Sequence, residues 1–326
     1  MKPKVLVTRK LPGDALKILE AACEVRLHAG DRAMSREEIL EAVAGCQGIL
    51  CMLSDRIDRE VLAAAGKELR VISNYAVGYN NIDIEDATKG GILVCNTPGV
   101  LTEATADFTW ALLLCAARRI IEGDRMVRQG GFKGWGPELL LGVELCGKTL
   151  GIAGMGRIGS AVARRALGFG MRIIYTDEKK NEIAEKELRA KMVDKDTLLK
   201  QSDFLSLHLP LTGKTRHYIG EKELDMMKPG AILINTARGP IVNEASLVSA
   251  LRQNRIEAAG LDVYENEPQI VPGLADLHNV VLAPHLGSAN SETRTRMAQM
   301  AVQNLLDALE GKLPEHCVNP QIGKNR

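Results

Sequence analysis

A glycine-rich segment in the middle of the chain has the spacing of a loop that binds phosphate groups. It reads Gly154-Met155-Gly156-Arg157-Ile158-Gly159, between an apolar strand pattern at 149–153 and a helical pattern at 158–167. In that setting the first glycine permits a tight turn, the second lets a pyrophosphate approach, and the third lets helix and strand pack. The helix N-terminus would add free N–H groups and a positive dipole end. The segment therefore predicts a dinucleotide site, although glycines at this spacing also occur in ordinary turns.

An acidic residue follows at the distance at which such sites bind a ribose. Asp177 comes directly after the next predicted strand, 172–176, and lies 18 residues beyond Gly159. A carboxylate there can accept hydrogen bonds from the adenosine ribose hydroxyls, which favours NAD over NADP. The alternative is that Asp177 only caps the following helix. Lys179 and Lys180 keep NADP open as the less favoured cofactor.

Three side chains further along have the chemistry that a hydride-transfer site needs, and each follows a predicted strand, where open parallel sheets bind ligands. Arg238 can bind the carboxylate of a 2-keto acid and polarise its ketone with a planar fork that Lys lacks. His285 suits a proton donor because imidazoles titrate near neutral pH, and Glu267 could hold it protonated. The alternative role is a surface ion pair for Arg238, a histidine that only packs for His285, and a solvated loop carboxylate for Glu267. The other histidines lack such a setting, and His208 is predicted within a strand.

The elements that must position these residues predict an α/β fold, because short β-branched segments alternate with helical patterns. In the first third, the predicted strands are 4–8, 24–28, 48–52, 71–75 and 92–95. The helices between them are predicted at 14–22, 36–43, 59–65 and 84–89, with Ser35 and Asp58 as caps. These elements form one small doubly wound unit.

A second, larger α/β series carries the glycine loop. It begins after Pro98 with a long apolar helix at 103–122 and a glycine-rich loop from 123 to 146. Its strands are predicted at 149–153, 172–176, 204–209, 231–235, 258–263 and 280–282, with helices that include 158–167 and 244–252. The final helix, 291–310, either covers this second sheet or returns to the first domain, and periodicity does not decide between the two.

Charge and composition exclude several kinds of partner. Lys and Arg number 42 against 41 Asp and Glu, so nothing favours nucleic acid or an anionic membrane. The most apolar stretch, 108–117, is well short of the roughly 20 residues of a membrane span, and the N-terminus lacks a signal-type run. We therefore expect a soluble, cytoplasmic protein with a small-molecule ligand. Seven scattered cysteines without a C-x-x-C pair indicate reduced core thiols and no metal site.

Taken together, the motifs resemble the D-isomer-specific 2-hydroxyacid dehydrogenase family, and within it the glyoxylate and hydroxypyruvate reductases. The likeness covers almost the whole chain. Besides the glycine loop, it rests on NYAVGYNNID at 74–83, NTPGVLTEATAD at 96–107, NTARG at 235–239, GLDV at 260–263 and PHLGS at 284–288. The resemblance implies a catalytic set of Arg, Glu and His, which falls on Arg238, Glu267 and His285.

The same resemblance implies how the chain is divided and what each part binds. Residues 1–98 and 289–326 would form a flavodoxin-like substrate domain, into which a Rossmann NAD-binding domain, 99–288, is inserted. The substrate would contact Met52, the backbone N–H groups of Val77 and Gly78, Arg238 and His285. The cofactor would contact the glycine loop with Arg157 and Ile158, and also Thr105, Asp177, Pro210, Thr236, Arg238, Asp262, His285 and Ser288. Asp262 would reach the nicotinamide amide. Members are commonly homodimers, built through residues 102–148.

The expected activity is therefore NADH-dependent interconversion of a small 2-keto acid and its 2-hydroxy acid, as in glyoxylate or hydroxypyruvate reductases. Phosphoglycerate and phosphite dehydrogenation are alternatives within the enzymes, although LTEATAD at 101–107 looks more like the glyoxylate reductase form. An NAD-sensing binding protein, similar to corepressors that resemble this family, is an alternative of another class. The intact set of Arg238, Glu267 and His285 argues against it.

Overall fold

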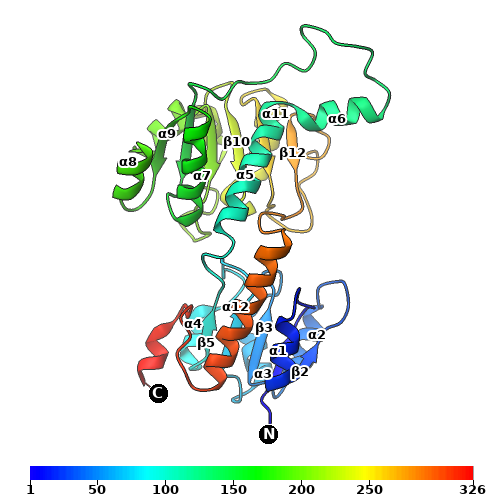
Figure 1. The fold of residues 1–326 in the computed structure, drawn as a ribbon, viewed down its shortest axis with the longest axis vertical. Helices are drawn as coiled ribbons and strands as arrows, with labels where there is room; N and C mark the ends of the chain where they lie inside the picture. Colours follow the sequence, from blue (N-terminus) through cyan, green and yellow to red (C-terminus); the bar gives the residue numbers. More distant parts are fainter. Residues whose placement is uncertain (326) are drawn as a thin grey trace. The chain divides into compact units, whose positions relative to one another are not determined.

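The computed structural model describes residues 1–325 and divides into two compact units, each built on a parallel sheet (Figure 1). Unit 1 comprises Met1–Leu101 and Ala289–Arg326, and unit 2 comprises Thr102–Ser288. The α/β class expected from the sequence is confirmed. None of the helices within residues 1–325 has the length and apolar character needed to cross a membrane.

Unit 1 contains a five-stranded sheet of order β2-β1-β3-β4-β5. Its strands are β1 (Lys4–Val7), β2 (Glu24–Leu27), β3 (Gly48–Cys51), β4 (Val71–Asn74) and β5 (Leu93–Cys95). The helices that connect them are α1 (Ala15–Ala22), α2 (Arg36–Ala42), α3 (Arg59–Ala65) and α4 (Ile84–Lys89). The strands β3, β4 and β5 are buried along their whole length, as is typical of parallel strands covered on both faces. Ser35 and Asp58 cap α2 and α3, as the sequence predicts.

The final helix, α12 (Ser291–Leu309), belongs to unit 1. Of the two options that periodicity left open, it therefore returns to the first domain and does not cover the second sheet. Figure 1 shows α12 lying along the sheet of this unit. Two polar side chains of the β4 region bind its backbone: the Ser73 hydroxyl donates to the Ala301 carbonyl and the Tyr75 hydroxyl to the Arg294 carbonyl, both at 2.7 Å. Apolar side chains such as Val302 and Leu305 complete the contact.

Unit 2 contains a seven-stranded sheet of order β12-β11-β10-β9-β6-β7-β8. Its strands are β6 (Thr149–Ala153), β7 (Arg172–Thr176), β8 (Lys191–Met192), β9 (Phe204–Leu207), β10 (Ile232–Asn235), β11 (Ala258–Leu261) and β12 (Val280–Leu282). Its helices are α5 (Thr102–Ala117), α6 (Ile120–Arg128), α7 (Arg157–Gly168), α8 (Glu182–Leu188), α9 (Lys195–Gln201), α10 (Glu221–Met226) and α11 (Glu244–Arg252), with a 3-10 turn η1 (Gly239–Ile241). The strand order reverses between β6 and β9, and such a switch point is where doubly wound sheets bind ligands.

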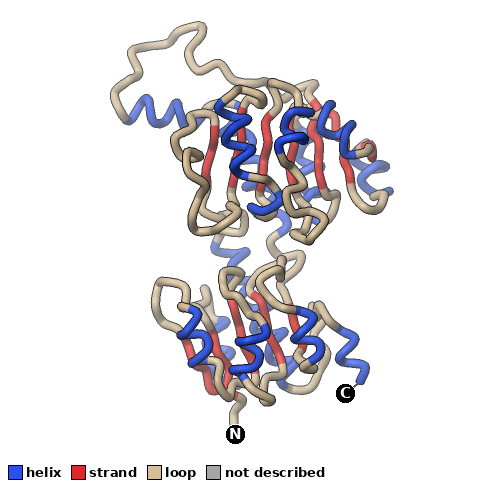
Figure 2. Tube along the Cα trace, turned by 180° about the vertical axis from the view of Figure 1, so that it is seen from behind, coloured by secondary structure: helices blue, strands red, loops and turns tan. Residues whose placement is uncertain are grey.

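The prediction of one long helix at 103–122 is wrong, because the structure has two helices in this region. α5 ends at Ala117, Arg119 adopts a left-handed conformation with φ 52°, and α6 begins at Ile120. The Val143 N–H donates to the Ala117 carbonyl at 2.8 Å. It thereby satisfies a carbonyl at the end of α5 that has no donor within the helix. The loop expected from residue 123 starts only after Arg128. It projects away from the rest of unit 2 (Figure 1 and Figure 2).

Two further differences concern short elements. The structure adds α8, β8, α9 and α10, which are too short and polar to give a clear periodic pattern. It also ends β9 at Leu207, so that His208, expected within the strand, follows it. The His208 imidazole contacts the Ser206 hydroxyl at 2.8 Å, and burial lowers its pKa to about 3. His208 is therefore a neutral residue beside the glycine loop.

Asn319 provides a test of how the carboxyl-terminal segment is attached to unit 1. Its side-chain oxygen accepts the Val94 N–H at 2.8 Å, and its amide donates to the Ile92 carbonyl and the Thr88 hydroxyl at 3.0 Å. The substitution Asn319→Ala would leave buried backbone groups unpaired, so we expect a loss of about 1–3 kcal/mol in unfolding free energy. Urea unfolding would measure this loss. The exposed Gln321→Ala is the matched control, and equal stability of the two variants would contradict the assignment.

Candidate active site

Two of the three loop glycines are required by the packing of the protein itself. Gly154 has φ 95°, and a Cβ there would lie 2.8 Å from the carbonyl carbon of His208. A Cβ on Gly159 would overlap the carbonyl oxygen of Gly154. Gly156 differs, because a Cβ built on it meets no atom within 4 Å. It is the N-cap of α7 and provides no side-chain cap, so an anionic group can approach the helix N-terminus there. The loop thus fits a dinucleotide pyrophosphate.

Side chains after β7 fix the shape of this loop. Asp177 accepts the Met155 N–H at 2.7 Å, while the Asn181 amide and the Ser160 hydroxyl donate to the Met155 carbonyl at 2.9 and 3.2 Å. Asn181 is also the N-cap of α8, accepting the Ala184 N–H. The alternative interpretation of Asp177 as a helix cap is therefore excluded. No sequence pattern pointed to Ser160 or Asn181.

The loops after β11 and β12 bring Glu267 and His285 into direct contact. The Nδ1 atom of His285 lies 2.9 Å from Oε2 of Glu267, and Oε1 of Glu267 accepts the Tyr264 N–H at 3.1 Å. Burial alone would raise the Glu267 pKa. The hydrogen bond and charge of His285, with smaller contributions from Tyr264 and Arg238, outweigh burial and lower it below its usual value. Because Nδ1 faces Glu267, Nε2 is the nitrogen left to exchange a proton.

Asp262 holds the backbone on which His285 sits. Its buried carboxylate accepts the N–H groups of Leu286 at 2.6 Å and Gly287 at 2.8 Å, and its carbonyl accepts the His285 N–H at 2.9 Å. His285 itself has a left-handed φ of 56°. Burial raises the Asp262 pKa, partly countered by the two N–H donors. This positioning role was not expected from the sequence.

Arg238 follows β10 and lies near the carboxylate of Glu267. Asn235 shapes its loop by accepting the Ala237 N–H at 3.1 Å and donating to the Arg238 carbonyl at 3.0 Å. Burial lowers the pKa of the guanidinium, and the charge of Glu267 acts in the opposite direction. A Cβ on Gly239 would overlap the backbone of Tyr264, so the loops after β10 and β11 touch. The structure therefore gathers the three expected catalytic residues within unit 2.

Two of the other expected cofactor residues, Thr105 and Thr236, are linked through Thr109. The Thr109 hydroxyl donates to the Thr105 carbonyl and shares a hydrogen bond with the Thr236 hydroxyl, both at 2.8 Å. A Cβ on Gly287 would lie 3.4 Å from Cγ2 of Thr105, which places the helix α5 against the His285 loop. Thr109 was not expected. The remaining residues are Arg157 and Ile158 in the first turn of α7, Pro210 after β9, and Ser288 after Gly287.

In unit 1, three asparagines shape the loops expected to bind substrate. The side-chain amides of Asn96, Asn74 and Asn81 donate to the carbonyls of Val77, Gly78 and Met52 at 2.7, 2.8 and 3.1 Å, respectively. Among the described residues, the N–H groups of Val77 and Gly78 have no hydrogen-bond partner. They are thus available to an anion. Sequence reasoning selected these N–H groups but not the asparagines.

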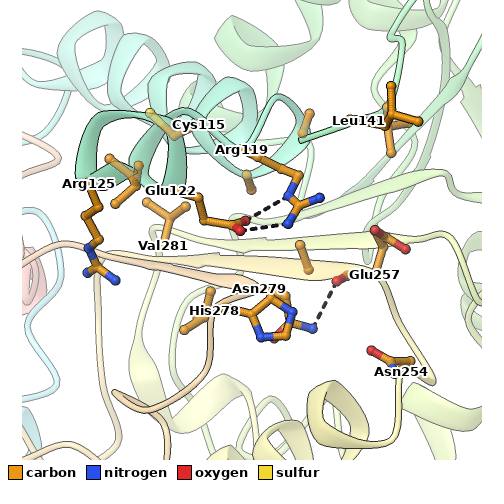
Figure 3. Close-up of a pocket in the computed structure, with 17 residues that line it drawn as sticks. Cys115, Arg119, Glu122, Arg125, Leu141, Asn254, Glu257, His278, Asn279 and Val281 are labelled. Carbon is orange, nitrogen blue, oxygen red and sulfur yellow. Dashed lines mark hydrogen bonds and ion pairs between the residues drawn. The ribbon is translucent and has the colours of Figure 1, made fainter. Parts of the chain in front are cut away.

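A cavity of about 130 Å³ lies elsewhere in unit 2 (Figure 3). It is lined by α5, α6 and the amino-terminal ends of β11 and β12. The Arg119–Glu122 ion pair, at 2.7 Å, and the Asn279 amide donating to the Glu257 carbonyl lie in its wall. Because the candidate catalytic residues follow the carboxyl-terminal ends of their strands, this cavity belongs to the opposite edge of the sheet.

Comparison with known proteins identifies the class. Residues 110–287 match the family model for the D-isomer specific 2-hydroxyacid dehydrogenase, NAD binding domain. The glyoxylate reductase of Thermococcus litoralis is 51% identical to this chain, over 99% of this chain and 98% of the relative. The chain therefore belongs to the D-isomer specific 2-hydroxyacid dehydrogenase family. It is an oxidoreductase acting on CH–OH groups and has a domain for a nicotinamide dinucleotide.

Solved structures agree with this membership. A protein from Thermus thermophilus is 49% identical and superposes with a TM-score of 0.90, covering 97% of this chain and 99% of that one. The NADPH-dependent glyoxylate/hydroxypyruvate reductase of Sinorhizobium meliloti, in complex with NADP and malonate, is 31% identical with a TM-score of 0.87. In that comparison 98% of each chain is covered.

The different surroundings of the loop glycines predict different effects of alanine. Gly156→Ala has room in the protein and a permitted φ of −74°, so its thermal stability should match that of the wild type. The added methyl group would occupy space that a pyrophosphate needs, and NADH affinity should fall at least about tenfold. Gly159→Ala should instead lose about 1–3 kcal/mol of stability by overpacking. Thermal melts and NADH fluorescence titrations measure both effects, and unchanged NADH binding by Gly156→Ala would refute the assigned loop function.

Proposed function

We propose that this protein is an NADH-dependent reductase of glyoxylate or hydroxypyruvate. The observation that carries the proposal is the Glu267–His285 pair beside Arg238 at the carboxyl-terminal ends of β10, β11 and β12. The relatives named glyoxylate reductase, at about half identity over the whole chain, support this choice of substrate. On this proposal, residues 99–288 form the NAD-binding domain, and residues 1–98 with 289–326 the substrate domain.

Each residue of the set has a defined chemical role in the proposal. The glycine loop would hold a reduced nicotinamide dinucleotide, which would supply the hydride for the 2-keto carbon. His285 donates the proton on Nε2 to the ketone oxygen, while Glu267 orients the ring through Nδ1 and balances its positive charge. Arg238 binds the substrate acid and polarises the ketone. The N–H groups of Val77 and Gly78 also bind the substrate carboxylate.

Among the cofactor contacts, Asp177 supports NADH as the preferred reductant. It follows β7 and already accepts the Met155 N–H, so its carboxylate lies at the glycine loop. A carboxylate at this position hydrogen-bonds a free ribose 2′-hydroxyl and repels a 2′-phosphate. The Sinorhizobium meliloti relative is described as NADPH-dependent. The preference of this chain for NADH over NADPH is therefore measured separately below.

A substrate panel tests the function and the cofactor together. We expect steady oxidation of NADH with glyoxylate and hydroxypyruvate, slower turnover with NADPH, and little activity with 3-phosphohydroxypyruvate or, in the oxidising direction, with phosphite. The absorbance of the reduced cofactor measures each rate. Binding of NADH without turnover of any keto acid would contradict the proposal and favour a sensor. Faster turnover with NADPH would contradict only the cofactor preference.

His285→Ala tests the proton donor separately from cofactor binding. We expect kcat to fall about 10²–10⁴-fold, the usual contribution of general acid catalysis, with an unchanged Kd for NADH. His278→Ala is the matched control, because His278 is exposed and lies at the cavity of Figure 3. Wild-type turnover by His285→Ala would rule out the assigned role.

We further propose that the protein is a homodimer assembled through residues 102–148. Apolar side chains on α6 and the projecting loop are exposed, with Val127 at 63%, Trp135 at 85% and Leu141 at 63%. Such gathered apolar side chains are typical of protein interfaces.

Sedimentation velocity should give twice the mass of one chain. The double substitution of Val127 and Leu141 to Glu should give single chains, whereas Leu313→Glu, at another exposed apolar position, should not. A monomeric wild type would refute this assembly.

A further inference from the structure

Two cysteines far apart in the sequence face each other in unit 1. Cys95 is the last residue of β5, and Cys317 forms an isolated antiparallel bridge with it. The flanking backbone groups define the register: the Asn96 N–H donates to the His316 carbonyl at 3.2 Å, and the Val318 N–H donates to the Val94 carbonyl at 2.7 Å. Cys95 and Cys317 therefore occupy a non-hydrogen-bonded pair, the position at which opposing side chains come closest.

This geometry is compatible with a disulfide bond. The Cα atoms of a non-hydrogen-bonded antiparallel pair lie about 4.5 Å apart, within the range of about 4.4–6.8 Å found for disulfides. The two thiols also influence each other's ionisation, which raises the pKa of Cys95 and lowers that of Cys317, and the Cys317 thiol donates to the Asn319 side-chain oxygen at 3.4 Å. Bond formation then requires side-chain rotation and little movement of the backbone.

We propose that Cys95 and Cys317 form a reversible dithiol–disulfide site that is oxidised by peroxides. The Cys317 thiolate attacks one peroxide oxygen, the O–O bond breaks, and Cys317 becomes a sulfenic acid while the other oxygen leaves as water. The Cys95 sulfur then attacks the Cys317 sulfur, and the second oxygen leaves as water. The two thiols lose two electrons and two protons, which reduce one hydrogen peroxide to two waters.

The surroundings of the two thiols assign these roles. Cys317 is partly exposed, whereas Cys95 is fully buried behind it. The interaction with Cys95 is the main cause that lowers the Cys317 pKa to about 7, and the interaction with Cys317, together with burial, raises the pKa of Cys95. Cys317 is thus the thiol that reacts first, since the thiolate is the nucleophile. Burial raises the pKa of Cys23, Cys46, Cys51 and Cys115.

The disulfide would join the carboxyl-terminal segment to a strand end that supports the loop expected to bind substrate. Asn96, the residue after Cys95, donates from its side chain to the Val77 carbonyl at 2.7 Å. Its own carbonyl accepts the Asn304 amide of α12 at 2.9 Å. A disulfide bond at Cys95 would therefore restrain β5 and the carboxyl-terminal segment together with Asn96, whose side chain holds the loop at Val77. Because it closes a very long chain loop, it should also raise the melting temperature.

Limited oxidation of the reduced protein with hydrogen peroxide tests the site. Thiols counted after denaturation should fall by two from seven, and non-reducing peptide mapping should find the Cys95 peptide joined to the Cys317 peptide. The melting temperature should rise by a few degrees and return with dithiothreitol. Iodoacetamide should label Cys317 faster than the other buried or half-buried cysteines, with a rate that increases through pH 7.

Two variants separate this site from general thiol oxidation. Cys317→Ser should show neither the linked peptide nor the rise in melting temperature, while Cys146→Ser, which removes an exposed thiol, should behave as the wild type in both. A sulfenic acid on Cys317 that never proceeds to the linked peptide would overturn the proposal. So would a disulfide that joins Cys317 to any cysteine other than Cys95.

Discussion

The buried carboxylate of Asp262 is the constraint on which the catalytic end of unit 2 depends. By accepting the N–H groups of Leu286 and Gly287 it ties the loop after β12 to the end of β11. His285 is held between these bonds with a left-handed backbone, and its ring therefore meets Glu267. Because all strands of the sheet are parallel, the glycine loop after β6 opens at the same edge. One sheet edge thus carries both the glycine loop and the residues proposed to transfer the proton.

Short polar side chains that bind backbone groups shape the loops of both units. In unit 2 the Asn235 side chain closes the turn that carries Arg238, and Asn181 holds the glycine loop through the Met155 carbonyl. In unit 1 the amides of Asn74 and Asn96 occupy the carbonyls of Gly78 and Val77, which leaves the N–H side of that loop available. Irregular loops need such partners because they lack the ladder of hydrogen bonds that helices and strands provide.

Much of this organisation could be predicted from the sequence, because strand patterns are short and bounded and because the glycine spacing has one physical meaning in a strand–loop–helix setting. The break at Arg119 could not, since Ile120 and Ile121 continue the apolar pattern past it. The pairing of Cys95 with Cys317 also could not be predicted. It depends on where the carboxyl-terminal segment lies after α12, and periodicity left the place of that helix open.

The most direct test of the account is a single turnover of glyoxylate with NADH that carries deuterium at the transferable C4 position. We expect the label to appear on C2 of the product glycolate, found by mass spectrometry, and the reduced-nicotinamide absorbance to be lost at a matching rate. Unlabelled glycolate, or oxidation of the cofactor without formation of glycolate, would contradict hydride transfer at the site formed by Arg238, Glu267 and His285.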